Sequence, residues 1–411
     1  MSTCLPYLRV LDMSRVFAGP WAGQILADFG ADVIKIEHPE TGDDARYLGV
    51  HRVDDNGDDT GETSSFLAMN RGKRSVAVDL KTPEGQEIIR KLAAESDVLI
   101  ENFKTGTLDR YKLGYEDLRA VNPKLVYCSI TGFGQTGPYS EQPGYDPLFQ
   151  AMSGLMSITG VPDGEPGAGP NLVGFSVSDI IAGLYATIAI LGAVNHRDRG
   201  GDGQHIDLAL LDSQIAALSH IGMNYLVSGK MPMRSGAASQ ITCPWQAFPC
   251  SDMDLMIAVG NDRQFKRLCK VLELEHLADD PRFQTNRERM RNKSALLPLL
   301  ITAFSRRPAG EWHEALKEAG VPSGPIKDFG QALQDPQVRH RQMVFDMPHP
   351  KTGSLRLFAN PIKFSETPVG YSRLPPRLGE HTQSVLAEVL HLTEQQIGDL
   401  LESKVIGSGA E

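Results

Sequence analysis

The chain has 411 residues, of which 41% are hydrophobic and 22% charged; these values are typical of a folded globular protein with two or three domains and exclude a small binding module or a disordered chain. Its 51 acidic residues exceed its 41 basic residues by ten, and the net charge of −10 disfavours nucleic acid as a partner. No signal peptide and no apolar stretch of membrane-spanning length is recognisable, so we expect a cytoplasmic protein with no membrane partner.

The first 130 residues repeat a helix followed by a β-branched strand. We expect these helix and strand pairs at 21–29 and 32–37, at 84–96 and 97–101, and at 115–121 and 125–130. Such alternation predicts right-handed crossovers and a parallel sheet with helices on both faces. The fold class is therefore α/β, with a Rossmann-like large domain.

The remaining elements predict a second, smaller domain. After Asp179 a long apolar helix reaches about Arg197, a strand follows at 205–211 and a helix at 212–227. We assign residues 1–228 to the first part of the large domain, 229–249 to a linker, 250–325 to a small α+β domain, and 326–411 to a linker and a C-terminal return to the large domain. A last helix is expected from Thr382.

Templates for nucleotide and metal sites fit poorly. The stretch Gly132–Gly137 has the spacing G-x-G-x-x-G after a strand, but Pro138 follows it at once and leaves no helix N-terminus for a pyrophosphate. The pair His313-Glu314 lacks the second histidine of a zinc-protease motif, and the five cysteines form no Cys-x-x-Cys pair. We predict no metal, and an NAD-dependent oxidoreductase is disfavoured.

One carboxylate has two open interpretations. Asp179 lies directly before the apolar run, where an acidic side chain ordinarily caps a helix by accepting hydrogen bonds from free N–H groups. The same environment can keep a carboxylate ionised and available as a nucleophile. Spacing alone does not separate the two roles.

Basic residues lie near predicted strand ends. Arg15 follows the first strand, Arg71, Lys73 and Arg74 lie in one short segment, and Lys104 and Arg110 follow the strand that ends at Glu101. Loops after the carboxyl ends of parallel strands line the crevice in which ligands bind, so these residues form a candidate phosphate site. A solvated charged rim is the alternative.

Several blocks in order resemble the family III CoA-transferases, the group of formyl-CoA transferase and carnitine CoA-transferase. The blocks are Leu11–Pro20, Phe29–Glu37, Asn70–Ser75, Ile100–Phe103, Gly132–Pro138, Pro143–Asp146, Gly203–Leu208, Gly320–Pro325 and Leu378–Thr382. The resemblance implies a Rossmann-like domain made from both chain ends, a small middle domain, and an interlocked homodimer.

The resemblance also assigns the site. It implies that Asp179 is a covalent nucleophile, with Tyr145 and Asp146 beside it, in a relay that passes through mixed anhydrides and an aspartyl-CoA thioester. The expected CoA-binding residues are Arg15, Val16, Phe17, Ala18, Arg71, Lys73, Asn102, Phe103, Lys104 and Arg110. CoA and acyl-CoA enter as substrates, and no permanently bound cofactor is expected.

Two departures from formyl-CoA transferase direct the substrate prediction. Phe17 stands where that enzyme has a glutamine, and residues 236–259 contain no tetraglycine run. The sequence looks closer to transferases that move CoA from succinyl-CoA to a short dicarboxylate, with Arg15 and Arg71 as candidates for the second carboxylate. A 2-methylacyl-CoA racemase of the same fold is the alternative, although such racemases have histidine at the position of Tyr145.

Overall fold

The computed structural model describes residues 3–54 and 56–409, which form two compact units. The first unit comprises the described residues up to Leu155, Val173–Gly222, and the described residues from His340 onward. The second comprises Met156–Leu172 and Met223–Arg339. Residues 156–172, expected in the large domain, thus belong to the second unit, and this unit extends on both sides of the expected range 250–325.

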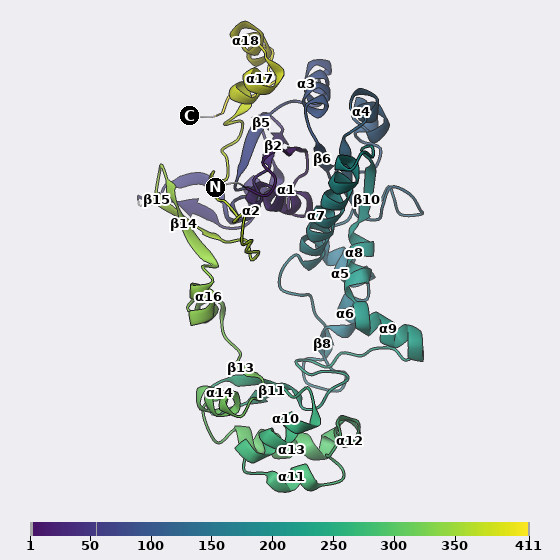
Figure 1. Cartoon of the computed structure of the whole chain (residues 1–411), viewed down its shortest axis with the longest axis vertical. Helices are drawn as coiled ribbons and strands as arrows, with labels where there is room; N and C mark the ends of the chain where they lie inside the picture. Colours follow the sequence, from purple (N-terminus) through teal and green to yellow (C-terminus); the bar gives the residue numbers. More distant parts are fainter. Residues whose placement is uncertain (1–2, 55, 410–411) are drawn as a thin grey trace. The chain divides into compact units, whose positions relative to one another are not determined.

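A six-stranded, all-parallel sheet forms the centre of the first unit (Figure 1). Its strands lie in the order β10-β7-β6-β1-β2-β5. Their bounds are β1 Arg9–Asp12, β2 Asp32–Glu37, β5 Lys73–Ala77, β6 Val98–Glu101, β7 Val126–Thr131 and β10 His205–Ala209. The chain runs outward from β1 to β2 and β5, then returns to β6 on the other side of β1. The order reverses between β1 and β6, as in doubly wound nucleotide-binding folds, and ligands bind at the carboxyl ends of strands beside such a reversal.

Helices cover both faces of this sheet because successive strand residues point to opposite sides. Val10 faces one core with the helices α1 (Ala18–Asp28) and α7 (Val177–Asp198), and Leu11 faces the other core. The second core is closed by α3 (Pro83–Ala94), α4 (Tyr115–Val121), α17 (Thr382–Leu390) and α18 (Glu394–Glu402). The C-terminal segment therefore returns to the first unit, where α17 lies against β5.

Helix α7 is the one helix in residues 3–54 and 56–409 that is long and apolar enough to cross a membrane by length and composition. It packs on α1, and Ala182, Ala186 and Ile190 are buried in the core that both helices share. Gly183 is required at the crossing, since a Cβ there would lie 2.6 Å from the Ala18 carbonyl oxygen.

The second unit has its own core of 20 buried side chains, among them Phe248, Phe265, Phe304 and Trp312. Its antiparallel strands are β11 Trp245–Pro249, β12 Asp254–Ala258 and β13 Ser323–Pro325, with the short pair β8 Gly160–Val161 and β9 Gly169–Pro170. Its helices are α10 Asp262–Val271, α11 Glu275–Asp279, α12 Asn286–Arg291, α13 Lys293–Phe304, α14 Ala309–Glu318, α15 Phe329–Leu333 and α16 Pro336–His340. This unit thus combines antiparallel strands with helices.

Shorter elements complete the chain. In the first unit they are η1 Asp44–Tyr47, β3 His51–Val53, β4 Asp59–Thr63, α2 Ser64–Met69, η2 Asp109–Tyr111, α5 Asp146–Met152, α8 Leu210–Ala217, β14 Val344–His349 and β15 Gly353–Phe358. Three helices cross the limits of the units: α6 (Leu155–Ile158), α9 (Ser219–Ser228) and α16, whose last residue His340 belongs to the first unit. The single helix expected at 212–227 is in fact two, because Ser219 has a φ of 44° and breaks the helical path between α8 and α9.

Candidate active site

A cavity of about 640 Å³ opens at the carboxyl ends of β1, β6 and β7, beside the reversal of strand order. All of its lining residues belong to the first unit. Among them are ten of the residues proposed from the sequence: Arg15, Val16, Phe17, Ala18, Asn102, Phe103, Lys104, Tyr145, Asp146 and Asp179. The sequence did not single out Asp44, Leu48, Thr105, Thr131, Ser140 or Gln142, which also line it.

Asp179 is the third residue of α7 and its carboxylate faces this cavity. The carboxylate forms no hydrogen bond or ion pair with any residue in the described ranges, although the residue is partly buried. Burial, and then the nearby negative charge of Asp146, raise the pKa of Asp179 from 3.8 to about 7. A carboxylate with free lone pairs and a raised pKa is a better nucleophile than one held by donors.

Asp146, unlike Asp179, accepts a hydrogen bond on each of its carboxylate oxygens. It is 6% exposed, and its carboxylate accepts the Ser178 N–H at 2.7 Å and the Gln150 side-chain amide at 2.6 Å. Asp146 therefore satisfies a free N–H in the first turn of α7 and fixes the start of the helix that carries Asp179. Tyr145, directly before it, is 77% exposed and stands at the cavity wall.

The turn after β1 forms the opposite wall. Arg15 lies over the Phe103 ring at 5.3 Å and pairs with Asp44 at 3.6 Å, with its guanidinium half-exposed. Phe17 is the N-cap residue of α1 and lines the cavity, where its ring provides an apolar wall.

The loop after β6 is clasped to that turn. The Asn102 side chain accepts the Arg15 N–H at 2.8 Å and donates to the Arg15 carbonyl at 2.7 Å. Glu101 accepts the Phe103 N–H at 2.8 Å, and Lys104 is exposed at the rim. Two neighbouring loops at the reversal point are thus joined by reciprocal hydrogen bonds.

The glycine loop after β7 does not form a dinucleotide site. Gly134 and Gly137 have φ values of 90° and 96°, and the Gln135 N–H is bound by the Asp207 carboxylate at 3.1 Å. The next helix, α5, begins only at Asp146, so no helix N-terminus follows the loop directly.

Three basic residues expected at the site lie outside this cavity. Arg71 and Lys73 are buried: Arg71 forms a paired contact with Asp28 at 2.8 and 2.5 Å, and Lys73 lies 2.7 Å from Asp12. The reason is that β5 begins at Lys73, so this segment precedes its strand and lies toward the amino edge of the sheet. Arg110 is exposed and donates to the Gly106 carbonyl at 3.3 Å.

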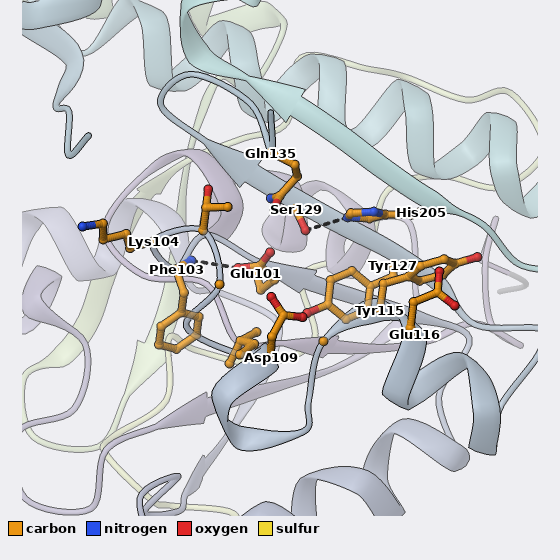
Figure 2. A pocket seen from close by; sticks show the side chains of 14 residues that line it. Glu101, Phe103, Lys104, Asp109, Tyr115, Glu116, Tyr127, Ser129, Gln135 and His205 are labelled. Carbon is orange, nitrogen blue, oxygen red and sulfur yellow. Dashed lines mark hydrogen bonds between the residues drawn. The ribbon is translucent and has the colours of Figure 1, made fainter. Parts of the chain in front are cut away.

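Two smaller pockets adjoin the same loops. One of about 340 Å³ shares Arg15 and Phe103 with the main cavity and is lined by Met13, Ile36 and Tyr111 among others. The other, of about 210 Å³, lies behind Phe103 and Lys104, where Ser129 joins His205 at 2.9 Å beside Glu101 (Figure 2). Burial raises the pKa of Glu101 to about 7.

Within the ranges that the structure describes, no cluster of three or more His, Cys, Asp or Glu side chains is arranged to hold a metal ion.

The family model for CoA-transferase family III matches residues 5–382. The chain belongs to this family. A succinate–glutarate CoA-transferase of Agrobacterium fabrum is 47% identical over 93% of this chain and 94% of its own length. The human succinyl-CoA:glutarate CoA-transferase is 40% identical over 97% of this chain and 89% of its own.

Other members of the family agree with this placement. A succinyl-CoA:D-citramalate CoA-transferase of Chloroflexus aurantiacus is 34% identical over 97% of both chains. The crystal structure of a CAIB/BAIF family protein from Brucella suis superposes with a TM-score of 0.83, at 44% identity, over 95% of this chain and all of that one. The mixed α/β fold with its large parallel sheet is therefore that of family III CoA-transferases, enzymes whose substrates are CoA thioesters.

Proposed function

We propose that this protein transfers CoA from succinyl-CoA to a short dicarboxylate, with glutarate as the first acceptor to test. The observation that carries the proposal is the Asp179 carboxylate, which lies without a hydrogen-bond partner among the described residues in a cavity at the reversal point of the sheet. The names of the relatives supply the donor and acceptor classes.

The proposed reaction uses one nucleophile, the Asp179 carboxylate, which has no hydrogen-bond partner among the described residues. Asp179 attacks the succinyl-CoA carbonyl carbon, the C–S bond breaks, and a succinyl-aspartyl anhydride and CoA thiolate form. The thiolate then attacks the aspartyl carbonyl, which releases succinate and leaves an aspartyl-CoA thioester. Glutarate attacks this thioester to give a glutaryl-aspartyl anhydride and the thiolate, which finally attacks the glutaryl carbonyl. Glutaryl-CoA leaves, the Asp179 carboxylate is regenerated, and no net proton is taken up.

We assign the nucleotide end of CoA to the neighbouring pocket, whose walls from Met13, Ile36 and Tyr111 suit an adenine ring, with Lys81 available to a phosphate. Three carboxylates also line this pocket, and two of them are already paired, Glu37 with Arg46 and Asp43 with Lys35. Phe103 lines both spaces and would contact the middle of the molecule. The thioester would then lie toward Asp179.

The acceptor's second carboxylate requires a cation, since an unpaired buried charge is costly. Of the two arginines proposed from the sequence, Arg15 lines the cavity, half-exposed and in a longer contact of 3.6 Å with Asp44, whereas Arg71 lies outside the cavity and is buried against Asp28 at 2.5 Å. We therefore assign the second carboxylate to Arg15. Phe17 would pack on the methylene chain of succinyl or glutaryl groups.

We further propose that the protein acts as a homodimer in the cytoplasm, without a permanently bound cofactor. Apolar side chains stand exposed on two helices, with Ile188 of α7 at 65% and Val227 of α9 at 81%, and a second copy would cover such surface. The five cysteines, Cys4, Cys128, Cys243, Cys250 and Cys269, are free thiols, as is usual in a reducing compartment. Interlocking of the two copies remains a prediction of the family resemblance.

The test is capture of the covalent intermediate. Incubation with succinyl-CoA and no acceptor should release succinate and add one CoA, less water, to the peptide that contains Asp179, as read by mass spectrometry. The matched control is D212N, because Asp212 is an exposed aspartate at the same third position of its helix, α8. Retention of the adduct in D179N, or its absence from the unmodified protein while glutaryl-CoA is still formed, would contradict the mechanism.

A further inference from the structure

Val16, on the wall of the cavity, has a backbone conformation that valine ordinarily avoids. Its φ is 69°, in the left-handed region, where the branched Cβ crowds the backbone. Among non-glycine residues with positive φ in the described ranges, Val16 is the only β-branched one. Such strain persists only where the surroundings fix the backbone firmly, and it concentrates at functional sites.

A buried ion pair holds the N–H of this residue. Asp43 accepts the Val16 N–H at 3.0 Å and the Ala45 N–H at 2.9 Å, and its carboxylate lies 2.7 Å from the Lys35 ammonium. Both charged side chains are almost fully excluded from solvent. The contact with Val16 is therefore made by a charged acceptor, which is stronger than a neutral one.

The two backbone units before Val16 are held in the same way. Lys35 also donates to the Ser14 carbonyl at 2.9 Å, and the Ser14 N–H is bound by Asp12 at 3.0 Å. Asn102 binds both the N–H and the carbonyl of Arg15. From the Ser14 N–H to the Val16 N–H, each backbone polar group is thus bound by a side chain from another part of the chain or from the strand before it.

We propose that Lys35 and Asp43 are positioning residues for acyl-CoA: they hold the turn at residues 14–16 in its strained conformation so that Arg15, Val16 and Phe17 present a preformed wall to the ligand. The proposal rests on the proposed function of the cavity. Burying two charges is expensive, and apolar residues would give comparable stability. The Lys35–Asp43 pair instead binds two backbone groups, the Ser14 carbonyl and the Val16 N–H, in the turn that faces the ligand. We therefore connect the free-energy cost of burying this pair with ligand binding.

If the ion pair holds Val16 in a backbone conformation that valine disfavours, weakening the pair should lower CoA affinity only while residue 16 has a strained backbone. Glycine adopts a φ of 69° without penalty, whereas alanine still has the Cβ and retains much of the strain. D43N should therefore raise the Kd for CoA about tenfold in the unmodified and V16A proteins, but at most about twofold in V16G. V16A is the matched control, since it removes the valine side chain and keeps the strained backbone.

The measurement is isothermal titration with CoA, together with KM for succinyl-CoA, on each member of the cycle after its folding is checked by thermal unfolding. D43N removes the nearest counterion of the buried Lys35 ammonium; if that variant does not fold, K35M/D43N replaces it in the same cycle, because it removes both buried charges together. A loss of CoA affinity that is equal in the Val16 and V16G backgrounds would overturn the positioning role. An unmodified protein that neither binds CoA nor transfers it would instead refute the proposed function, so the two failures are distinguishable.

Discussion

Replacing the Asp179 carboxylate with a neutral amide should stabilise the protein as it removes activity. Burial raises the pKa of Asp179 from 3.8 to about 7, which corresponds to at most about 4 kcal/mol in favour of the neutral over the charged form in the folded protein. The side chain keeps some solvent contact, so roughly half of this is a reasonable expectation. The helix N-terminus favours the charged form by about 0.5 kcal/mol, which leaves D179N more stable by roughly 1–2 kcal/mol.

The pH dependence of the stability difference between D179N and the unmodified protein distinguishes the loss of a buried charge from a general change in packing. Because the folded pKa is raised, the folded state binds more protons than the unfolded state, and stability falls as pH rises between about 4 and about 7. D179N should therefore differ little from the unmodified protein below about pH 4, and should unfold roughly 1–2 °C higher above about pH 7.

Thermal unfolding across this pH range measures the difference, with D212N reporting the effect of losing a charge at the third position of an exposed helix end. A stability gain that does not grow with pH, or a D179N protein less stable than the unmodified one above pH 7, would refute the assignment of a bare, partly buried carboxylate.

Four further outcomes are expected. The rate of CoA transfer should rise with pH through about 7, as Asp179 ionises, and D179N should lose at least about three orders of magnitude in kcat; a flat profile between about pH 6 and 8 would contradict the nucleophile. R15A should reduce kcat/KM for glutarate much more than for butyrate, whereas K104A should reduce both alike; equal losses in R15A would show that Arg15 contacts CoA alone. F17Q should lower kcat/KM for succinyl-CoA while formyl-CoA is less affected, which competition between the two donors would measure. R71A should destabilise the protein by about 3–5 kcal/mol in urea unfolding, since it leaves Asp28 buried without its partner, while the exposed Lys104 can be replaced at little cost.

Strong local periodicity made several elements predictable from sequence. The strand at 32–37 and the helix at 115–121 have the predicted bounds, because a β-branched run and an amphipathic turn with an acidic start are local signals. The helix α18 was not predicted, although Thr393 and Gln396 form a capping box at its start that the sequence contains. The second unit takes in residues 156–172, a short segment whose two-residue strands carry no periodic signal.

Prediction of the site depended on where each strand ends. Arg15 and the loop at 102–104 follow β1 and β6 and reach the cavity, whereas Arg71 and Lys73 precede or begin β5 and are buried. A cation that precedes a strand therefore lies at the amino edge of the sheet, opposite to the edge at which ligands bind. The partner of Arg71, Asp28, lies 43 residues earlier in another helix, and no local pattern encodes that contact.

The two carboxylates at the start of α7 explain why capping and catalysis need not compete. Asp146 belongs to helix α5 and accepts the Ser178 N–H. It therefore caps α7, the role that the sequence first suggested for Asp179. Its negative charge then adds to burial in raising the pKa of Asp179. If Asp179 accepted that N–H itself, its lone pairs would be engaged and its pKa would be lowered, which would weaken it as a nucleophile. A second carboxylate that binds the helix end therefore leaves the first one free to attack a thioester.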